Sequence, residues 1–425
     1  MKSFLLTVTC LAGVLLSSYA QSSCASYIYY QQEIAKDQVL FNRLQQAEEF
    51  INRFLKSDQQ ITLHGAMPTS QPIIRIPVVV HIVYRVEEEN ISDQQVRSQI
   101  EVLNKEFRRL HADTTKIPSQ FKSIAADCAI EFVLAKINPR GYATTGITRK
   151  KTSAYSFGLN DKIKFSTEGG DDGWDSDQYL NIWVANLQIG IAGYSSILGG
   201  PKNKDGIVVR TTAFGNTGKL SAPYLKGRTA IHELGHWLGL RHIWGDQYCG
   251  NDGVEDTPPQ GIATRGCPTG VVSSCNNAPT GNMYTNYMDL TDDACMNMFT
   301  LGQRDKMRAA FAVGAPHSTL LRSNGATGIP LPGPDPGEVV PRKSVSIYPN
   351  PTARMVFVDI HTSKELLGTS ITIHNQLGQL LYQTRITKSI TDINVQFLKE
   401  GIYFLRTEKQ ARPTKLLITN RATNP

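Results

Sequence analysis

Apolar positions recur with helical spacing near the start of the chain and then give way to a β-branched run. Between Ser26 and Ser57 there is no Gly or Pro, and apolar residues return every three or four positions (Leu40, Leu44, Ala47, Ile51, Phe54, Leu55). This spacing places them on one face and predicts a helical leader. The stretch from Ile73 to Val86 is rich in β-branched residues, which predicts a buried first strand and the start of a folded domain.

One helix and three more strands are expected downstream. Ser92 and Gln95 have capping-box spacing, and apolar residues continue at helical spacing as far as Phe107. Further β-rich runs follow at Cys128 to Ala135, Tyr179 to Ala185 and Ile207 to Arg210. This order of a strand, a helix and more strands is typical of an α/β unit.

The last quarter of the chain has a different pattern. Between Gly325 and Pro341, nine of 17 residues are Gly or Pro, so neither a helix nor a sheet strand can continue through this stretch. A linker is therefore expected there. Beyond it, short β-rich runs are separated by turn residues, at 345–348, 356–360, 371–374, 393–397, 402–405 and 415–418. These runs predict a small all-β sandwich.

The charge of the chain and the composition of its N-terminus limit the kinds of function that are expected. The 425 residues include 44 basic and 37 acidic ones, a net charge of +7, without any block of five Lys or Arg residues. This pattern gives nucleic-acid binding no support. The apolar run Phe4 to Leu16, followed by Ser18 and Ala20, predicts a secretory signal cleaved after Ala20. No later stretch reaches ~18 apolar residues, so no transmembrane anchor is expected.

Six cysteines remain after the predicted signal is removed. Four of them lie within 47 residues, at 249, 267, 275 and 295. In an exported protein this cluster favours two disulfides over a thiolate metal site. Cys24 and Cys128 are left over, and cysteine counting leaves open whether they pair with each other.

The strongest chemical signal is the segment from His232 to His242, which matches H-E-x-x-H-x-x-G-x-x-H at every fixed position. On a helix, His232 and His236 project from one face and can bind one metal ion. Gly239 can adopt a positive φ and end the helix, so that His242 supplies a third nitrogen. Five matched positions in an exported chain argue against histidines that merely decorate an amphipathic helix.

Three histidine ligands indicate a catalytic zinc site, because structural sites close all four positions with protein ligands. Zinc held this way lowers the pKa of a bound water toward ~7 and polarises a substrate carbonyl. Glu233 is the predicted general base, which takes the proton of the water and later passes it to the leaving amine.

From Ile73 to Ala310 the chain resembles the pappalysin family of metzincins, particularly its ulilysin-like bacterial members. The resemblance rests on IPVVVHIVY, GITR (146–149), LNIWVANL, HELGHWLGLRH, EDTP (255–258) and NYMDLTDDACMNMFTLGQRDKM. It implies a zincin-type α/β (α+β) catalytic domain with an active-site helix and a Met-turn at Met288, which lies 46 residues after His242. It also implies an endopeptidase with zinc on His232, His236 and His242.

The same resemblance assigns further residues. It implies disulfides Cys249–Cys275 and Cys267–Cys295 near the active-site rim. It also implies a calcium site near them, for which Asp252 and Thr257 offer hard oxygen ligands. Relatives usually carry Tyr two residues after the turn methionine, whereas this chain has Leu290, which puts assistance by a phenol in doubt.

Two residues carry predictions about specificity and latency. In ulilysin-like relatives an aspartate at the matching position lies at the floor of the pocket for the residue after the scissile bond, so the resemblance implies that Asp293 favours cleavage before Arg or Lys. The alternative is that Asp292 and Asp293 are solvated loop residues or calcium ligands. Cys24 precedes the helical leader, and its thiolate is a candidate fourth zinc ligand in a zymogen. Pairing of Cys24 with Cys128 is the alternative.

The C-terminal stretch resembles the sorting domain of the type IX secretion system of Gram-negative bacteria. YPNPT (348–352), LGQLL (377–381), GIYFL (401–405) and KLLI (415–418) carry this similarity. The alternative is an ordinary binding sandwich, because fold alone does not fix function.

The sequence therefore predicts five segments. They are a signal peptide (1–20), a helical propeptide (21–72), a metzincin catalytic domain (73–324), a Pro/Gly-rich linker (325–342) and a C-terminal all-β immunoglobulin-like sandwich (343–425) for sorting. The expected function is that of a secreted zinc endopeptidase made as a zymogen, which acts on protein or peptide substrates and contacts the secretion machinery. The alternative function is a surface adhesin with an inactive metalloprotease scaffold.

Overall fold

The computed structural model describes residues 24–62, 71–333, 335, 345–360, 366–407 and 413–419. The chain divides into two compact units, Met1–Gly333 and Pro334–Pro425, which are described separately below. The predicted signal peptide (1–20) lies outside the described residues. Among the residues that are described, no helix is both long and apolar enough to span a membrane.

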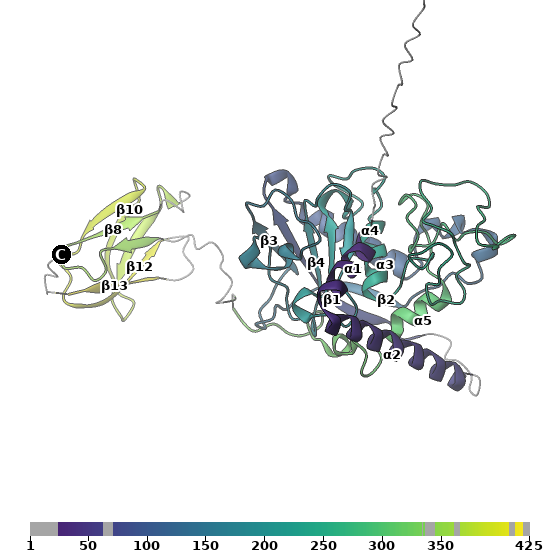
Figure 1. The fold of residues 1–425 in the computed structure, drawn as a ribbon. Helices are drawn as coiled ribbons and strands as arrows, with labels where there is room; N and C mark the ends of the chain where they lie inside the picture. Colours follow the sequence, from purple (N-terminus) through teal and green to yellow (C-terminus); the bar gives the residue numbers. More distant parts are fainter. Residues whose placement is uncertain are drawn as a thin grey trace, which may run out of the picture. The chain divides into compact units, whose positions relative to one another are not determined.

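A six-stranded sheet forms the centre of the first unit (Figure 1). Its order is β2-β1-β4-β6-β5, β3 also pairs with β1, and every pair is parallel except β5 with β6. The strands are β1 (Ile74–Tyr84), β2 (Ile130–Leu134), β3 (Ile147–Lys151), β4 (Leu180–Ala185), β5 (Gly193–Ser195) and β6 (Ile207–Arg210). The predicted strands at β1, β2, β4 and β6 are confirmed, whereas the pattern did not predict the short strands β3 and β5.

Strand β1 is buried on both faces, as expected for a largely parallel sheet. Ile76, Val78 and Ile82 belong to the main core, together with residues of the helices on that side, while Val83 packs into a second cluster on the other side. The helices that contribute to the main core include α3 (Asp93–Phe107), α4 (Arg228–Trp237) and α5 (Leu301–Ala309). The predicted cap of α3 is present, because the Ser92 hydroxyl accepts the Gln95 N–H at 3.2 Å.

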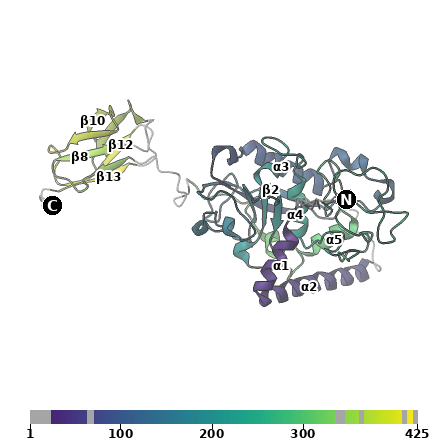
Figure 2. The same cartoon turned by 45° about the horizontal axis from the view of Figure 1, so that its top comes forward.

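The N-terminal segment consists of two helices rather than one, α1 (Ser26–Lys36) and α2 (Gln38–Thr62). The break lies at Asp37, whose carboxylate accepts the N–H of Val39 at 2.8 Å and so begins α2. Both views show α1 beside α4 and α2 along the outside of the unit (Figures 1 and 2).

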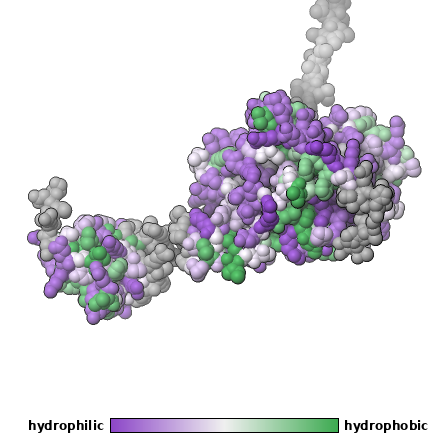
Figure 3. Space-filling model, turned by 90° about the horizontal axis from the view of Figure 1, so that it is seen from below, coloured by the Kyte–Doolittle hydropathy of each residue, from purple (hydrophilic) through white to green (hydrophobic). Residues whose placement is uncertain are grey.

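The two helices of this segment are packed differently. Tyr29 of α1 is fully buried, whereas the far part of α2, with Phe54 and Leu55, borders a groove of about 1220 Å³ that reaches Phe311. The underside of the unit shows hydrophobic side chains gathered near its middle (Figure 3).

Short 3-10 helices occupy many of the loops. Those in the described residues are η1 (Glu87–Glu89), η2 (Ala112–Lys116), η3 (Ser119–Phe121), η4 (Lys162–Lys164), η5 (Ser166–Glu168), η6 (Lys202–Lys204), η7 (Thr211–Ala213) and η8 (Ser318–Arg322). The first unit continues past η8, since the Leu331 N–H donates to the Gly141 carbonyl at 2.7 Å.

The second unit contains two antiparallel sheets with one shared core. Their orders are β10-β9-β12-β13 and β11-β8-β7. The strands are β7 (Ser346–Tyr348), β8 (Met355–Asp359), β9 (Ser370–His374), β10 (Leu380–Arg385), β11 (Ile390–Asn394), β12 (Gly401–Thr407) and β13 (Thr414–Ile418). Val356 and Val358 of one sheet and Ile371 and Ile373 of the other are buried in the same cluster. The all-β prediction is confirmed, although β10 was recognised only as a motif.

Candidate zinc centre

Helix α4 carries two of the three predicted zinc ligands, and a carboxylate from a distant part of the chain accepts backbone N–H groups at its N-terminus. The Asp293 carboxylate accepts the N–H groups of Lys226 at 2.8 Å and Arg228 at 3.2 Å, at the positive end of the helix. The helix ends after Trp237, and Gly239 adopts φ +90°, as the motif predicts. This turn returns the chain toward the helix and brings His242 beside His232.

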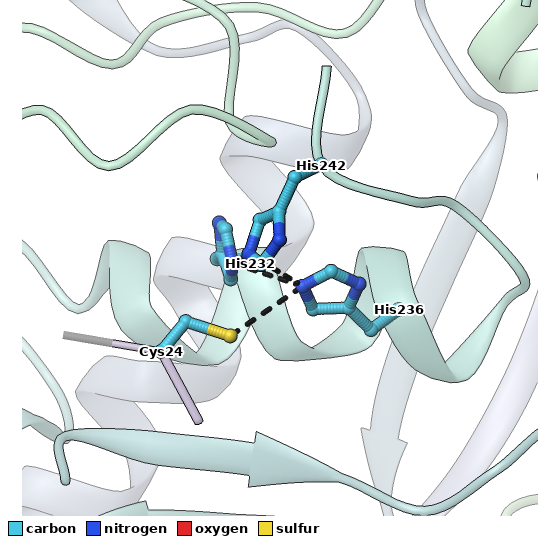
Figure 4. A group of neighbouring side chains, drawn as sticks. All are labelled: Cys24, His232, His236 and His242. Carbon is cyan, nitrogen blue, oxygen red and sulfur yellow. Dashed lines mark hydrogen bonds between the residues drawn. The ribbon is translucent and has the colours of Figure 1, made fainter. Parts of the chain in front are cut away.

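The Nε2 atoms of the three histidines converge on one point (Figure 4). His236 lies 3.1 Å from His232 and 3.2 Å from His242, and the His232–His242 distance is 3.2 Å. A tetrahedral zinc with Zn–N bonds of ~2.0–2.1 Å would hold its nitrogens ~3.3 Å apart. The donor set therefore fits a zinc ion.

The other ring nitrogen of each histidine contacts an acceptor. His232 Nδ1 lies 2.6 Å from the Tyr287 carbonyl, and His236 Nδ1 lies 2.9 Å from the Leu240 carbonyl. His242 Nδ1 contacts the Asp246 carboxylate. Donation from Nδ1–H leaves Nε2 deprotonated and fixes the ring orientation, which is the arrangement that a metal ligand needs.

Burial reinforces the neutral state of these rings. It lowers the pKa of His232 and His242 to about 3 and that of His236 well below its usual value. Trp244 stacks on His242 with its ring centre 4.2 Å away. Trp244 and Asp246 lie two and four residues after His242, outside the motif, and were not predicted from the sequence.

Glu233 is fully buried next to the three histidines. Burial raises the pKa of Glu233 to about 8, even though hydrogen bonds from Ser26 and Cys24 oppose the shift. Its Oε1 has no hydrogen-bond partner among the described residues. Gly193 of β5 makes room for this carboxylate, because a Cβ at position 193 would lie 2.9 Å from Glu233 Cγ.

Met288 lies directly beneath α4. A Cβ at Gly235 would come within 2.4 Å of the Met288 sulfur, so the glycine permits this close approach. Leu290, at the position where relatives usually have Tyr, offers no hydroxyl. The neighbouring tyrosines do not replace it, because the Tyr287 hydroxyl donates to Glu106 and the Tyr284 hydroxyl donates to the Gly270 carbonyl.

The N-terminal segment reaches this centre through Cys24 and Ser26. Cys24 Sγ lies 3.5 Å from His236 Nε2, close to the ~3.6 Å expected between a thiolate and an imidazole on one tetrahedral zinc. Together these four side chains form a metal-binding group among the described residues. The Ser26 hydroxyl donates to Glu233 Oε2 at 2.7 Å.

The structure does not form the alternative Cys24–Cys128 disulfide. Cys128 is fully buried in the main core, where its N–H donates to the Phe107 carbonyl. Two other bridges are present, Cys249–Cys275 and Cys267–Cys295, which is the pairing that the resemblance implies.

A cavity of about 180 Å³ adjoins Glu233, and Asp292 and Asp293 both line it. Asp293 is 2% exposed, and burial raises its pKa to about 6. It is thus not a solvated loop residue. Arg265 also lines this cavity.

The two candidate calcium ligands lie together away from the histidines. The Thr257 hydroxyl lies 2.9 Å from each carboxylate oxygen of Asp252, and both residues are buried. The Lys306 ammonium donates to the Asp252 carbonyl at 3.1 Å. Burial raises the pKa of Asp252 to about 6.

Two family descriptions match the chain. Residues 166–312 match the peptidase family described as pregnancy-associated plasma protein-A, and residues 346–419 match a secretion system C-terminal sorting domain. An extracellular metalloprotease of Pyricularia oryzae is 28% identical over 60% of this chain and 81% of its own length. Extracellular metalloprotease 1 of Coccidioides posadasii is 30% identical, over 57% of this chain and 79% of its own.

Solved structures are similar as well. Mature mirolysin of Tannerella forsythia in complex with a cleaved peptide is 46% identical, covers 62% of this chain and all of its own, and has a TM-score of 0.59. A promirolysin point mutant from the same organism is 41% identical, covers 72% of this chain and all of its own, and has a TM-score of 0.63.

Proposed function

This chain belongs to the pregnancy-associated plasma protein-A (pappalysin) family of metalloproteases, and on that premise we propose that it is a zinc endopeptidase that cleaves before basic residues. It is a secreted enzyme made as a zymogen and exported through its C-terminal sorting domain. The observation that carries the proposal is the convergence of three histidine Nε2 atoms beside a buried carboxylate.

In this proposal, His232, His236 and His242 hold the zinc, and Met288 forms the turn beneath it. Bound zinc supplies Lewis acidity and makes water a nucleophile near neutral pH. Glu233 takes a proton from the water and later passes it to the leaving amine. Burial raises the pKa of this carboxyl to about 8 while Cys24 and Ser26 lie against it.

Cys24 is proposed to maintain latency. Its sulfur lies at ligand distance from the histidine cluster, and Ser26 binds the carboxylate oxygen of Glu233. A thiolate in the fourth zinc position and a hydroxyl on the base would together keep substrate and water away. Removal of the N-terminal segment would then activate the enzyme.

Asp293 is the proposed determinant of substrate preference. Asp293 lines the cavity beside Glu233, and charge-assisted hydrogen bonds are stronger than neutral ones. An Arg or Lys side chain in the cavity would face this carboxylate. Asp293 also caps α4, so its orientation is held by the helix that carries the ligands.

The remaining assignments extend the proposal to the whole chain. Asp252 and Thr257 are proposed to contribute to a structural calcium site near the two disulfides. The segments are proposed as a signal peptide (1–20), a propeptide (21–72), a metzincin catalytic domain (73–324), a linker (325–342) and an immunoglobulin-like sorting sandwich (343–425).

Digestion of a proteome-derived peptide library by the purified mature protein tests this function. Wild type should cleave internal bonds, with Arg or Lys enriched directly after the scissile bond, and a chelator should abolish cleavage. Glu233→Gln is the matched control, because it keeps the three ligands and should lose about 10²- to 10⁴-fold or more of the rate. Wild-type cleavage by this variant would contradict the mechanism, and random cleavage sites would contradict only the specificity.

A further inference from the structure

A second cluster of interactions joins the N-terminal segment to the catalytic unit, outside the histidine centre. Tyr29 of α1 is 2% exposed, and its hydroxyl donates to the Asp161 carboxylate at 2.8 Å. One helical turn later, Glu33 pairs with Lys204 at 3.0 Å. Their partners lie in the loops around η4 and η6, which connect strands of the sheet.

Lys164 is the centre of this cluster. It is fully buried, and its ammonium lies 3.0 Å from Asp161 and 2.7 Å from the Lys204 carbonyl. Three aromatic rings surround it, with ring centres 5.3–5.5 Å away, from Tyr29, Trp183 and Tyr194. The segment therefore contributes one wall of an aromatic cage around a buried cation.

Helix α1 adds an ion pair to the charges that the catalytic unit already holds. In the catalytic unit, Asp161 pairs with both Lys164 and Lys204. Glu33 of α1 pairs with Lys204 and also with Lys36 of its own helix. Detaching α1 would remove one carboxylate partner from the partly buried Lys204, so this arrangement favours a bound α1.

Asp161 has φ +59°, a left-handed conformation that Asp adopts more readily than most non-glycine residues. In this conformation its carboxylate contacts Lys164, Lys204 and the Tyr29 hydroxyl together.

We propose that Asp161, Lys164, Lys204 and Tyr194 form a docking site for a phenol with a carboxylate one helical turn away, filled by Tyr29 and Glu33 of α1. The site holds the N-terminal segment on the catalytic unit independently of the Cys24 thiol and of zinc. It extends the latency part of the proposed function, since the segment would stay bound after the thiol contact is broken.

Hydrogen exchange of the α1 amides in the full chain tests this proposal without any measurement of activity. The background carries Glu233→Gln to prevent self-cleavage and Cys24→Ser to remove the thiol. In this background, α1 should remain protected. Tyr29→Phe removes only the hydroxyl bound to Asp161 and should speed exchange of the α1 amides about tenfold or more, because hydrogen bonds to charged groups are the strong ones.

Tyr27→Phe is the matched control, because Tyr27 lies on the same helix, is 42% exposed and should leave exchange unchanged. Lys204→Met removes the partner of Glu33 on the catalytic unit. When it is combined with Glu33→Gln, the increase in the exchange rate should be smaller than the sum of the two single effects. Equal exchange in the Tyr29 and Tyr27 variants would overturn the proposal, as would full loss of protection in Cys24→Ser alone. Failure of the protease assay would leave these rates unaffected.

Discussion

At the scale of single residues, burial changes the pH at which the Asp293 carboxyl becomes charged. Its pKa of about 6, raised by burial, means that the carboxyl changes from neutral to charged as the pH rises through 6. The ratio of kcat/KM for a substrate with Arg after the scissile bond to one with citrulline there should therefore increase from pH 5 to 7. A charged hydrogen bond predicts a final ratio of about 10- to 100-fold.

Taking a ratio cancels the pH dependence of the catalytic step, which both substrates share. Asp293→Asn should give a low ratio that does not change with pH, because the amide oxygen can still cap α4 but carries no charge. Asp292→Asn should retain the wild-type rise. A wild-type ratio that is flat across this range would refute the assignment of the pocket.

Asp246 was not predicted from the sequence, and in the structure it contacts one of the three histidines. Its carboxylate contacts His242 Nδ1, and such partners of metal-binding histidines typically contribute 10- to 100-fold in metal affinity. Asp246→Asn should weaken zinc binding by about that factor in a chelator competition assay. Glu255→Gln, an exposed carboxylate in the same loop region, should not. Equal affinities would mean that His242 needs no orienting carboxylate.

At the scale of elements, the N-terminal segment and β5 form one boundary of the active site. Ala25 donates its N–H to the Gly193 carbonyl at 3.0 Å, and the Ser195 N–H donates to the Ser26 hydroxyl at 2.9 Å. Cys24 is thereby held over the histidines by its neighbours in the chain. The contact of the Cys24 thiol with His236 and the hydrogen bonds to β5 together hold this end of the segment in place.

Replacing Cys24 tests its part in latency. Zymogen with Cys24→Ala should activate with a shorter lag than wild type, because it lacks the sulfur that we propose as the fourth zinc ligand. Casein cleavage followed from the moment of dilution measures this lag. Cys128→Ala removes a core thiol that is remote from the histidines and should leave the lag as it is. An unchanged lag in the Cys24 variant would assign latency to other contacts.

At the scale of the whole molecule, the two units have separate cores. A chain that ends at Pro341 should therefore fold, keep its thermal midpoint within a few degrees and retain protease activity. Without the sorting domain it should remain in the periplasm, as measured by immunoblots of cell fractions beside the full-length protein. Normal amounts of the truncated chain outside the cell would favour a binding role for the second unit.

The sequence by itself determined the features that depend on local spacing. The shared face of His232 and His236, at positions i and i+4, follows from helix geometry. The glycine at position 239 permits the positive φ that ends the helix there. Strands β1, β2, β4 and β6 of the main sheet followed from runs of buried β-branched residues, whereas the short strands β3 and β5 did not. Strand β10 escaped because its residues are largely exposed, and only pairing with β9 makes it a strand.

The tertiary structure alone decided the contacts between distant parts of the chain. Cys24 reaches His236 across 212 positions. Tyr29 and Asp161 are 132 positions apart, and neither lies in a recognisable motif. Such contacts depend on how strands and loops pack in three dimensions. The free energy of burying and pairing charges cannot be read from the spacing of residues along the chain.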